Sequence, residues 1–327
     1  MSNAPKVSVI TGYYNRADVL ERTILSIMNQ TFVDFEFIIF NDCSTDNTQV
    51  LLDDLVKGLD DNRVVVVHHE QNKGFVQGMI DAVNIAKGQY ICVQGSGDIS
   101  EPARLEEQSA VLDANSNIAV VGSYYSNVVE ENGAERERKK VSDDISFEQL
   151  QKENYFSHGE VMFRRTHYEQ AGGYRAQFVN CQDYDLWLRM IKFGQFFTVK
   201  KNLYKRFVRT DGVSYNPKSF LNQSRYFFLA KDMSKLKLEE QAQLLSRVDS
   251  SGIEDLYSLE ESRIQSRMFK AVLRSAVWGY YETAKELARV GVTSALKRVF
   301  LLTFIGLYGS KIGAPVRTLV NKKFGIE

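Results

Sequence analysis

The residues of this chain that could carry chemistry are concentrated in four short polar segments, residues 11–16, 41–48, 70–74 and 94–100. Each segment combines hydroxyl, amide or carboxylate side chains, which are the groups that hydrogen-bond polar ligands. None contains a Cys/His set with zinc spacing, and the four histidines of the chain form no metal-binding helix pair. These segments therefore suggest binding of a polar ligand and not zinc chemistry.

The fourth segment contains the sequence Gln-Gly-Ser-Gly-Asp, which ends at Asp98. Its glycines, Gly95 and Gly97, could let backbone N–H groups approach phosphate oxygens and form an anion-binding nest. Asp98 supplies one carboxylate, and a hard divalent cation held by a single protein carboxylate is bound weakly. Asp98 is therefore the one weak metal candidate, and no metal site is predicted.

Several reaction classes are disfavoured because their motifs are missing. The first segment, Thr-Gly-Tyr-Tyr-Asn-Arg at 11–16, has neither the GxGxxG spacing of a dinucleotide fingerprint nor the GxxxxGK of a phosphate loop. No GxSxG nucleophile elbow occurs in the chain. NAD chemistry, ATP hydrolysis and esterase activity are therefore not expected.

The composition limits the partners and the compartment. The 327 residues contain 41 Lys and Arg against 41 Asp and Glu, so no global charge favours nucleic-acid binding. The three cysteines, Cys43, Cys92 and Cys181, are odd in number and far apart, which is typical of reduced thiols. The first six residues have no apolar core of a signal peptide, and no run of about 18 apolar residues occurs. We expect a cytoplasmic protein.

Four short runs of β-branched and aromatic residues begin near Val7, Phe35, Arg63 and Gln89. A polar stretch follows each run, and a helical period follows the first three, with Gly88 expected to end the third helix. Strand, loop and helix repeat at a pitch of about 28 residues, which predicts a doubly wound, mostly parallel α/β sheet. Because ligands bind at the carboxyl ends of such strands, we expect the four polar segments to form one site.

The remainder of the chain is expected to complete the domain and add a helical region. Residues 118–140 contain an Asn-Gly hairpin signal, a strand is expected at 161–164, and a helix at 183–193. From 219 the pattern becomes almost wholly helical. We therefore predict a catalytic domain at 1–218, with halves of about 1–100 and 101–218, and a helical region at 219–327.

Seven segments of the chain, in one order, resemble family 2 of the nucleotide-sugar glycosyltransferases, whose members adopt the A-type glycosyltransferase fold. The resemblance runs from about Lys6 to Ser214 and implies an inverting, hexosyltransferase-like enzyme. The seven segments are Val7 to Arg16, Ser26 to Glu36, Asn41 to Thr48, Pro102 to Gln108, Met162 to Arg165, Gly172 to Arg175 and Gln182 to Arg189.

The resemblance assigns the nucleobase to Tyr14, whose ring would pack against it, and to Asp42, whose carboxylate would accept a base N–H. Uracil or thymine has such an N–H, so a UDP-type or dTDP-type donor is expected. The alternative is that Asp42 and Ser44 cap the helix that follows. The other residues that we assign to substrate binding are Thr11, Gly12, Ser96, Asp98 and Arg209.

Asp183 matches the general base of the family, the second residue of its Glu-Asp or Gln-Asp pair. Inversion requires an acceptor hydroxyl to attack opposite the nucleotide, and a carboxylate beside that hydroxyl removes its proton. The start of a helix would keep Asp183 ionised. The alternative is that Asp183 and Asp185 are ordinary acids of a first helical turn.

The chain departs from the family after the fourth strand, where an Asp-x-Asp motif usually holds Mg²⁺ or Mn²⁺ on the diphosphate. Gly95 and Gly97 occupy the positions of both motif carboxylates. Arg209 falls where many relatives have a histidine, and its guanidinium could bind phosphate in a bidentate manner. The alternative places Arg209 in an ordinary basic surface loop with Lys205 and Arg206.

Two functions follow from these features. One is an inverting glycosyltransferase that extends a saccharide or lipid-linked saccharide in surface polysaccharide or glycolipid synthesis, and the other is a non-catalytic partner that binds nucleotide-sugar or glycan. Residues 295–323 join an apolar helix to basic residues and a single acid follows, Glu327. This segment is expected either to lie on an anionic membrane surface or to be buried in the chain or in a homodimer.

Overall fold

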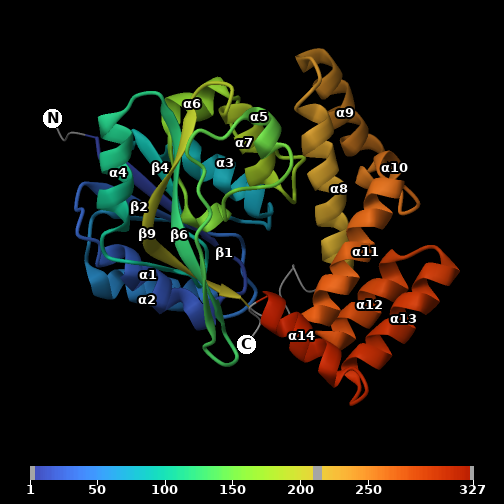
Figure 1. Cartoon of the computed structure of the whole chain (residues 1–327). Coiled ribbons are helices and arrows are strands. Elements are labelled where there is room, and N and C mark those ends of the chain that lie inside the picture. The colour runs from blue at the N-terminus through green and yellow to red at the C-terminus, as the bar shows by residue number, and fades with distance from the viewer. Residues whose placement is uncertain (1–3, 209–215, 325–327) are drawn as a thin grey trace. The chain divides into compact units, whose positions relative to one another are not determined.

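The computed structural model describes residues 4–208 and 216–324, the last four of these by backbone alone. The chain divides into two compact units, Met1–Arg209 and Thr210–Glu327. Figure 1 shows strands and helices interleaved in the first unit and helices in the second. The two units are described separately below.

The first unit is built on one mixed sheet with the strand order β3-β2-β1-β4-β8-β6-β9-β5, and β7 pairs with β6 beside that path. Strands β1 to β4 are mutually parallel, whereas β8 runs antiparallel to both β4 and β6. The strands are β1 Val7–Tyr13, β2 Phe35–Asn41, β3 Val64–His68, β4 Tyr90–Val93, β5 Ile99–Ser100, β6 Ile118–Val129, β7 Glu135–Arg138, β8 Met162–Arg164 and β9 Gln195–Val208.

Helices connect these strands and cover both faces of the sheet (Figure 1). Side chains of α1, α2 and α4 pack on one face, while α3 packs against β1 and β2 from the other. The predicted doubly wound, mostly parallel fold is therefore confirmed. The helical segments of this unit are η1 Ala17–Val19, α1 Leu20–Met28, α2 Thr48–Leu59, α3 Phe75–Ile85, α4 Arg104–Ala114, α5 Phe147–Leu150, η2 His158–Glu160, α6 Arg165–Gln170 and α7 Gln182–Met190.

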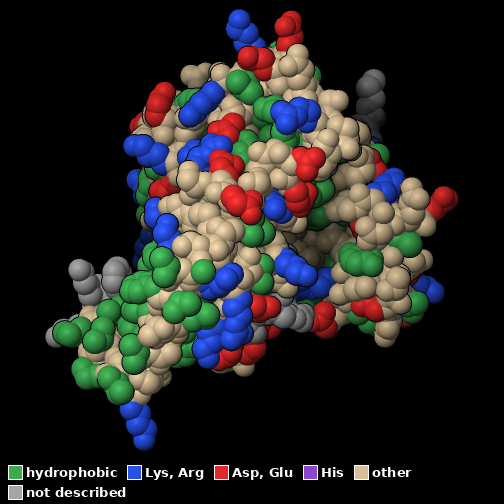
Figure 2. Space-filling model, turned by 90° about the vertical axis from the view of Figure 1, so that its right-hand side faces the viewer, with side chains coloured by type: hydrophobic (Ala, Val, Ile, Leu, Met, Phe, Trp, Pro, Cys, Tyr) green, Lys and Arg blue, Asp and Glu red, His purple; other side chains and the backbone are tan. Residues whose placement is uncertain are grey.

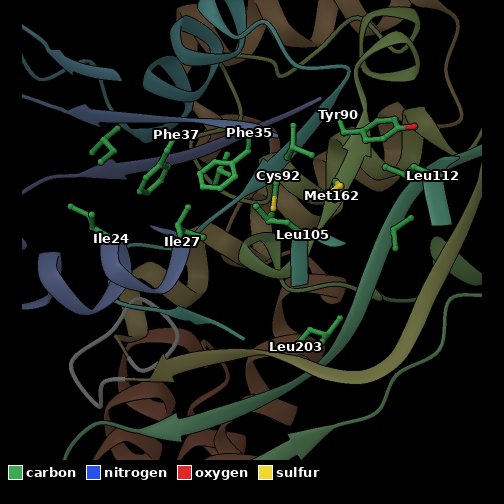
Figure 3. Close-up of a cluster of buried hydrophobic side chains, with 14 of the residues drawn as sticks. Ile24, Ile27, Phe35, Phe37, Tyr90, Cys92, Leu105, Leu112, Met162 and Leu203 are labelled. Atoms are coloured by element: carbon green, nitrogen blue, oxygen red, sulfur yellow. The ribbon is translucent and has the colours of Figure 1, made fainter. Parts of the chain in front are cut away.

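A continuous hydrophobic core fills the face of the sheet that carries α1. Figure 3 shows Phe35 and Phe37 of β2 pointing toward Ile24 and Ile27 of α1. All four side chains are almost completely buried. Strands β1 and β2 are buried along their whole length, which explains why the sequence shows unbroken apolar runs there instead of alternation.

Gly88 does not end a helix, so that expectation was wrong. Helix α3 ends at Ile85, and Ala86 caps it in an extended conformation. Gly88 instead lies against β1, where its N–H donates to Ser8 Oγ at 2.8 Å and a Cβ would overlap the Ser8 backbone. The glycine is therefore required by a close approach of two backbones.

The second unit consists of seven helices over the residues that the structure describes. No single helix among them is long and apolar enough to cross a membrane, although α13 and 314–320, bent by 92°, pass that test as a pair. The helices are α8 Pro217–Met233, α9 Leu238–Ser251, α10 Ile253–Leu256, α11 Ser262–Val277, α12 Tyr281–Gly291, α13 Ala295–Gly309 and α14 Ala314–Phe324.

One buried arginine, Arg104 at the start of α4, ties the loop after β4 to the rest of the first unit. Its side chain is fully buried, and Nη2 donates to the carbonyls of Val93 and Val161 at 2.9 and 3.3 Å. Nη1 donates to Gln94 Oε1 and Ser100 Oγ at 3.1 and 2.9 Å. The guanidinium therefore joins the ends of two strands to both ends of the loop.

We expect Arg104→Met to lower the free energy of unfolding by roughly 3 kcal/mol or more, because several buried acceptors lose their donor at once. The control is Arg63→Met, which removes a partly exposed ion pair with Asp61 and should change stability by less than about 1 kcal/mol. Urea unfolding followed by circular dichroism measures both. Similar losses in the two variants would contradict the role given to Arg104.

Candidate functional site

The polar segments after β1 and β2 are joined directly at the carboxyl edge of the sheet. Asn15 Oδ1 accepts the Thr45 N–H at 2.8 Å, and the Asn15 N–H donates to Ser44 Oγ at 3.0 Å. Asn15 and Cys43 both adopt left-handed backbone conformations, with φ of 52° and 58°. Two successive loops are thus held in one arrangement by side-chain contacts and by turns that are uncommon for residues other than glycine.

Asp42 holds the third polar segment in place. Its buried carboxylate accepts the Lys73 and Gly74 N–H groups, both at 2.9 Å, and lies 2.8 Å from His69 Nδ1. Neither Asp42 nor Ser44 caps α2, because the N-cap residue of that helix is Asn47, and the N–H of Thr48, its first residue, donates to Asp46 Oδ1 at 2.9 Å. The capping alternative is therefore wrong for this chain.

Exposed aromatic rings stand beside these loops. Tyr14, directly after β1, is 47% exposed, and Phe75, the first residue of α3, is 40% exposed. Thr11 and Gly12 are instead buried within β1. A Cβ on Gly12 would overlap the Phe40 ring, which gives this glycine a packing role in β1.

The fourth segment is fastened to β9 through Asp98. Tyr204 Oη donates to Asp98 Oδ2 at 2.6 Å, and the Phe207 N–H donates to Oδ1 at 2.8 Å. Burial raises the pKa of Asp98, and the bonds from Tyr204 and Phe207 act in the opposite direction. Ser96 is half-buried between the two glycines. Both carboxylate oxygens of Asp98 thus accept hydrogen bonds from β9.

Asp183 is a half-buried carboxylate in the first turn of α7. Asn154 Nδ2 donates to its Oδ2 at 2.8 Å, which orients the carboxylate. His158 lies near enough to feel its charge: burial lowers the pKa of His158, and Asp183 opposes that shift. The next residue, Gly159, lies directly against the backbone of Gly95. Asp183 is therefore oriented by Asn154 and influences His158, and the residue after His158 packs against the loop that follows β4.

Some residues of this arrangement were missed by sequence reasoning. Asn154 and His158 lie in a stretch without strong periodicity, and Arg16 and Arg22 look like ordinary arginines in the sequence. Phe75 was missed although an exposed aromatic residue at a helix start after a glycine could have indicated it. Arg209, which we assigned to phosphate binding, lies outside the described residues.

Taken together, the first unit carries a half-buried carboxylate oriented by an amide, two exposed rings and a glycine-containing loop. The family described as Glycosyl transferase family 2 matches this chain over residues 8–172, about half of its length. The chain belongs to glycosyl transferase family 2. It is therefore a glycosyltransferase by family, as the motifs predicted.

Curated relatives agree with this membership. The chain is 32% identical to EpsE of Bacillus subtilis over 223 residues, which are 67% of this chain and 78% of EpsE. It is 29% identical to the chondroitin synthase of Pasteurella multocida over 269 residues, which are 79% of this chain but only 25% of that protein. Family 2 members related to this chain thus include an enzyme of polysaccharide synthesis.

Solved structures of glycosyltransferases share the fold. Residues 1–349 of S. aureus TarS in complex with UDP-GlcNAc match with a TM-score of 0.56 at 17% identity, covering 98% of this chain and 92% of that one. The mannosyltransferase PcManGT from Pyrobaculum calidifontis, in complex with GDP-Man and Mn²⁺, matches with a TM-score of 0.58 at 16% identity, covering 99% and 86%. The A-type glycosyltransferase fold expected from the sequence is therefore confirmed.

The metal motif usual in the family does not fit the loop of this chain. A Cβ at Gly95 would overlap the Asp98 carboxylate and stand 2.9 Å from Tyr204 Oη. Gly97 has a φ of +95°, and a Cβ there would lie 2.7 Å from Arg16 Nη2. No group of three or more His, Cys, Asp or Glu residues suited to a metal ion occurs in the described part of the chain. In this conformation of the loop, a carboxylate at either position would require Asp98, Tyr204 or Arg16 to move.

Gly97→Ala should be much more destabilising than Gly133→Ala, although both glycines have positive φ, because only Gly97 has neighbours in the space that a Cβ would fill. We expect Gly133→Ala to cost about 1 kcal/mol from backbone strain alone. Gly97→Ala should cost roughly 1–3 kcal/mol more, since Arg16 must move. Urea unfolding of both variants checks this, and equal losses would contradict the packing around Gly97.

Proposed function

We propose that the chain transfers a sugar, with inversion, from a UDP-type or dTDP-type donor to an acceptor hydroxyl, and that Asp183 is the general base. The observation that carries this proposal is the half-buried Asp183 carboxylate, which Asn154 orients in the first turn of α7. A binding module has no need of a carboxylate held in this way. Membership of glycosyl transferase family 2 supports the same reaction class.

In this reaction the acceptor oxygen forms a bond to the anomeric carbon as the bond from that carbon to the diphosphate oxygen breaks. Asp183 takes the proton of the acceptor hydroxyl, and the nucleoside diphosphate leaves with the electron pair. One carboxylate oxygen accepts from Asn154, so the other is available to the acceptor. The dipole of α7 favours the ionised form of Asp183 that this role requires.

Tyr14 and Asp42 are proposed to bind the nucleobase. Tyr14 is exposed directly after β1, where its ring can stack on a base. Asp42 Oδ2 accepts one hydrogen bond among the described residues, from the Gly74 N–H, and a carboxylate oxygen has two acceptor positions. One position thus remains for the ring N–H of uracil or thymine. In this proposal Thr11, Gly12 and Ser96 shape the donor pocket, and Arg209 contacts the diphosphate.

The acceptor is proposed to be a growing surface polysaccharide or glycolipid, because the chondroitin synthase of Pasteurella multocida is among the relatives. The alternative is a non-catalytic partner that binds nucleotide-sugar or glycan. The observation that favours this alternative is the loop in which Gly95 and Gly97 replace the metal ligands. Loss of those ligands removes one means of stabilising the leaving group, so catalysis must be measured directly.

We also propose that a cytoplasmic chain contacts the inner face of an anionic membrane through α13 and α14. Helix α13 buries Leu301, Ile305 and Tyr308 and leaves another side apolar and exposed. Figure 2 shows hydrophobic side chains gathered at the lower left of the view. The exposed large hydrophobic residues of α13 and α14 and of the turn between them are Leu296, Val299, Phe300, Leu307, Ile312, Val316 and Leu319.

The charge of this segment favours a bilayer as the occupant of the apolar surface. Lys297 and Lys311 are exposed, and no acidic residue occurs between 292 and 326. Apolar side chains inserted into the headgroup layer and lysines near anionic lipids each strengthen such binding, the lysines by about 1 kcal/mol apiece. A lipid-linked acceptor would be found at the same surface.

Asp183→Asn should leave donor binding intact and lower turnover by about 10² or more, the scale of general-base catalysis. The donor is first identified by screening nucleotide-sugars for thermal stabilisation, since a ligand at about 100 times its dissociation constant adds roughly 2.7 kcal/mol. Glu106→Gln, which changes another first-turn acid, should leave turnover near the wild-type value. Unchanged turnover in Asp183→Asn would remove the base assignment, and donor binding without turnover in the wild type would favour the binding partner.

Flotation with vesicles tests the membrane contact. The full chain should float with anionic vesicles, stay unbound to zwitterionic ones, and lose the association in high salt. Phe300→Ser with Leu307→Ser should abolish flotation, whereas Val50→Ser, at a residue of α2 that is 61% exposed, should not. A chain that fails to float, or a double variant that changes only from dimer to monomer, would mean that the apolar surface is a protein interface.

A further inference from the structure

Three arginines from separate elements surround the loop that follows β4. Arg16 follows β1, Arg22 belongs to α1, and Arg206 belongs to β9. All three side chains are partly buried. Arg16 and Arg22 lie against Gly97, and Arg206 precedes Phe207, whose N–H bonds Asp98, so that its charge acts on Asp98. The loop that lacks metal ligands is therefore surrounded by three guanidinium groups, which stay positively charged at any physiological pH.

Arg22 is fixed in this cluster by three contacts. Its Nε donates to the Gly97 carbonyl at 2.6 Å, and its Nη2 pairs with Glu130 at 2.8 Å. Its guanidinium lies over the Phe207 ring, 4.0 Å from the centroid. Because Arg22 binds the backbone of Gly97 directly, it sets the conformation of the loop as well as its charge.

Arg16 occupies the space where the second motif carboxylate of other family members would begin. Its Nη2 lies 2.7 Å from the position of a Cβ on residue 97. The Nε atoms of Arg16 and Arg206 are buried and have no hydrogen-bond partner among the described residues. Buried donors are normally satisfied, so two unpaired guanidinium N–H groups beside one loop are donors that an anionic ligand could satisfy.

The charges near the cluster leave it positive. Among the described residues, the carboxylates of Asp98 and Glu130 contribute negative charge to the cluster, and three guanidinium groups contribute positive charge. Glu160 also lies near Arg206, but burial raises its pKa to about 8, so it is mostly protonated at neutral pH. A net positive, partly buried cluster with unpaired N–H donors suits a diphosphate.

We propose that Arg16 and Arg206, held in place with Arg22, bind the diphosphate of the donor in place of a divalent cation. This inference rests on the proposed function and names how the leaving group is held. As the bond to the anomeric carbon breaks, negative charge grows on the diphosphate, and guanidinium groups that never lose their protons stabilise that charge. Transfer by this chain then needs no added metal.

The test compares a nucleoside diphosphate with its nucleoside by isothermal titration into the full chain. UDP and uridine are titrated in EDTA and again in Mn²⁺, with dTDP and thymidine in parallel. In EDTA the wild type should bind the diphosphate more tightly than the nucleoside, and Mn²⁺ should change that ratio by less than about twofold. Arg16→Gln should weaken diphosphate binding by about 10- to 100-fold and leave nucleoside binding unchanged, as expected for a lost hydrogen bond to a charged group.

Two further variants keep the test decisive. Arg206→Gln should reproduce the loss if Arg16→Gln fails to fold, because both side chains carry an unpaired Nε. Arg63→Gln, at an ion-paired arginine beside the amino end of β3, should leave both affinities unchanged. Diphosphate binding that requires Mn²⁺, or folded variants that bind like the wild type, would overturn the inference and leave the proposed function standing. A wild type that binds none of the four compounds would overturn both.

Discussion

The position of the candidate site depends on one buried guanidinium. Arg104 is fully buried without a carboxylate bonded to it, so its charge is balanced by neutral acceptors: two carbonyl groups, two side-chain oxygens from the loop after β4, and Gln108. Removing any acceptor leaves part of a charge unsolvated in the interior, which is costly. This requirement fixes the end of β4, the loop and the start of β8 relative to one another.

Strand β9 is also joined to the loop after β4 in the surroundings of Arg104. Tyr204 of β9 lies under the Arg104 guanidinium, 4.8 Å from ring centroid to Cζ, and its hydroxyl reaches both Asp98 and the Gly95 N–H. Strands β1 to β4 and the later strands are therefore joined by polar contacts at the loop after β4. Gly159 packs against that junction, and the charge of Asp183 acts on its neighbour His158.

The sequence was sufficient for elements that local pattern determines and insufficient for contacts between distant residues. Strands β1 to β4 begin within a residue or so of the positions predicted, because buried runs of β-branched residues end sharply at polar loops. The reason for Gly88 could not be predicted, since a close approach to Ser8 is a property of the folded sheet. The partners of Asp42 lie 27 to 32 positions away in the sequence. Local spacing therefore suggested that Asp42 caps a helix, whereas in the structure its carboxylate holds the loop after β3.

The packing around Gly95 and Gly97 also limits which side chains these two positions can accept. An aspartate restored at position 95 meets Asp98 and Tyr204, and one restored at position 97 meets Arg16 in a backbone conformation that disfavours side chains. A side chain at position 95 is therefore energetically coupled to Asp98 and Tyr204, and one at position 97 to Arg16. Engineering a metal site into this loop would need changes at these neighbours together with the two glycines.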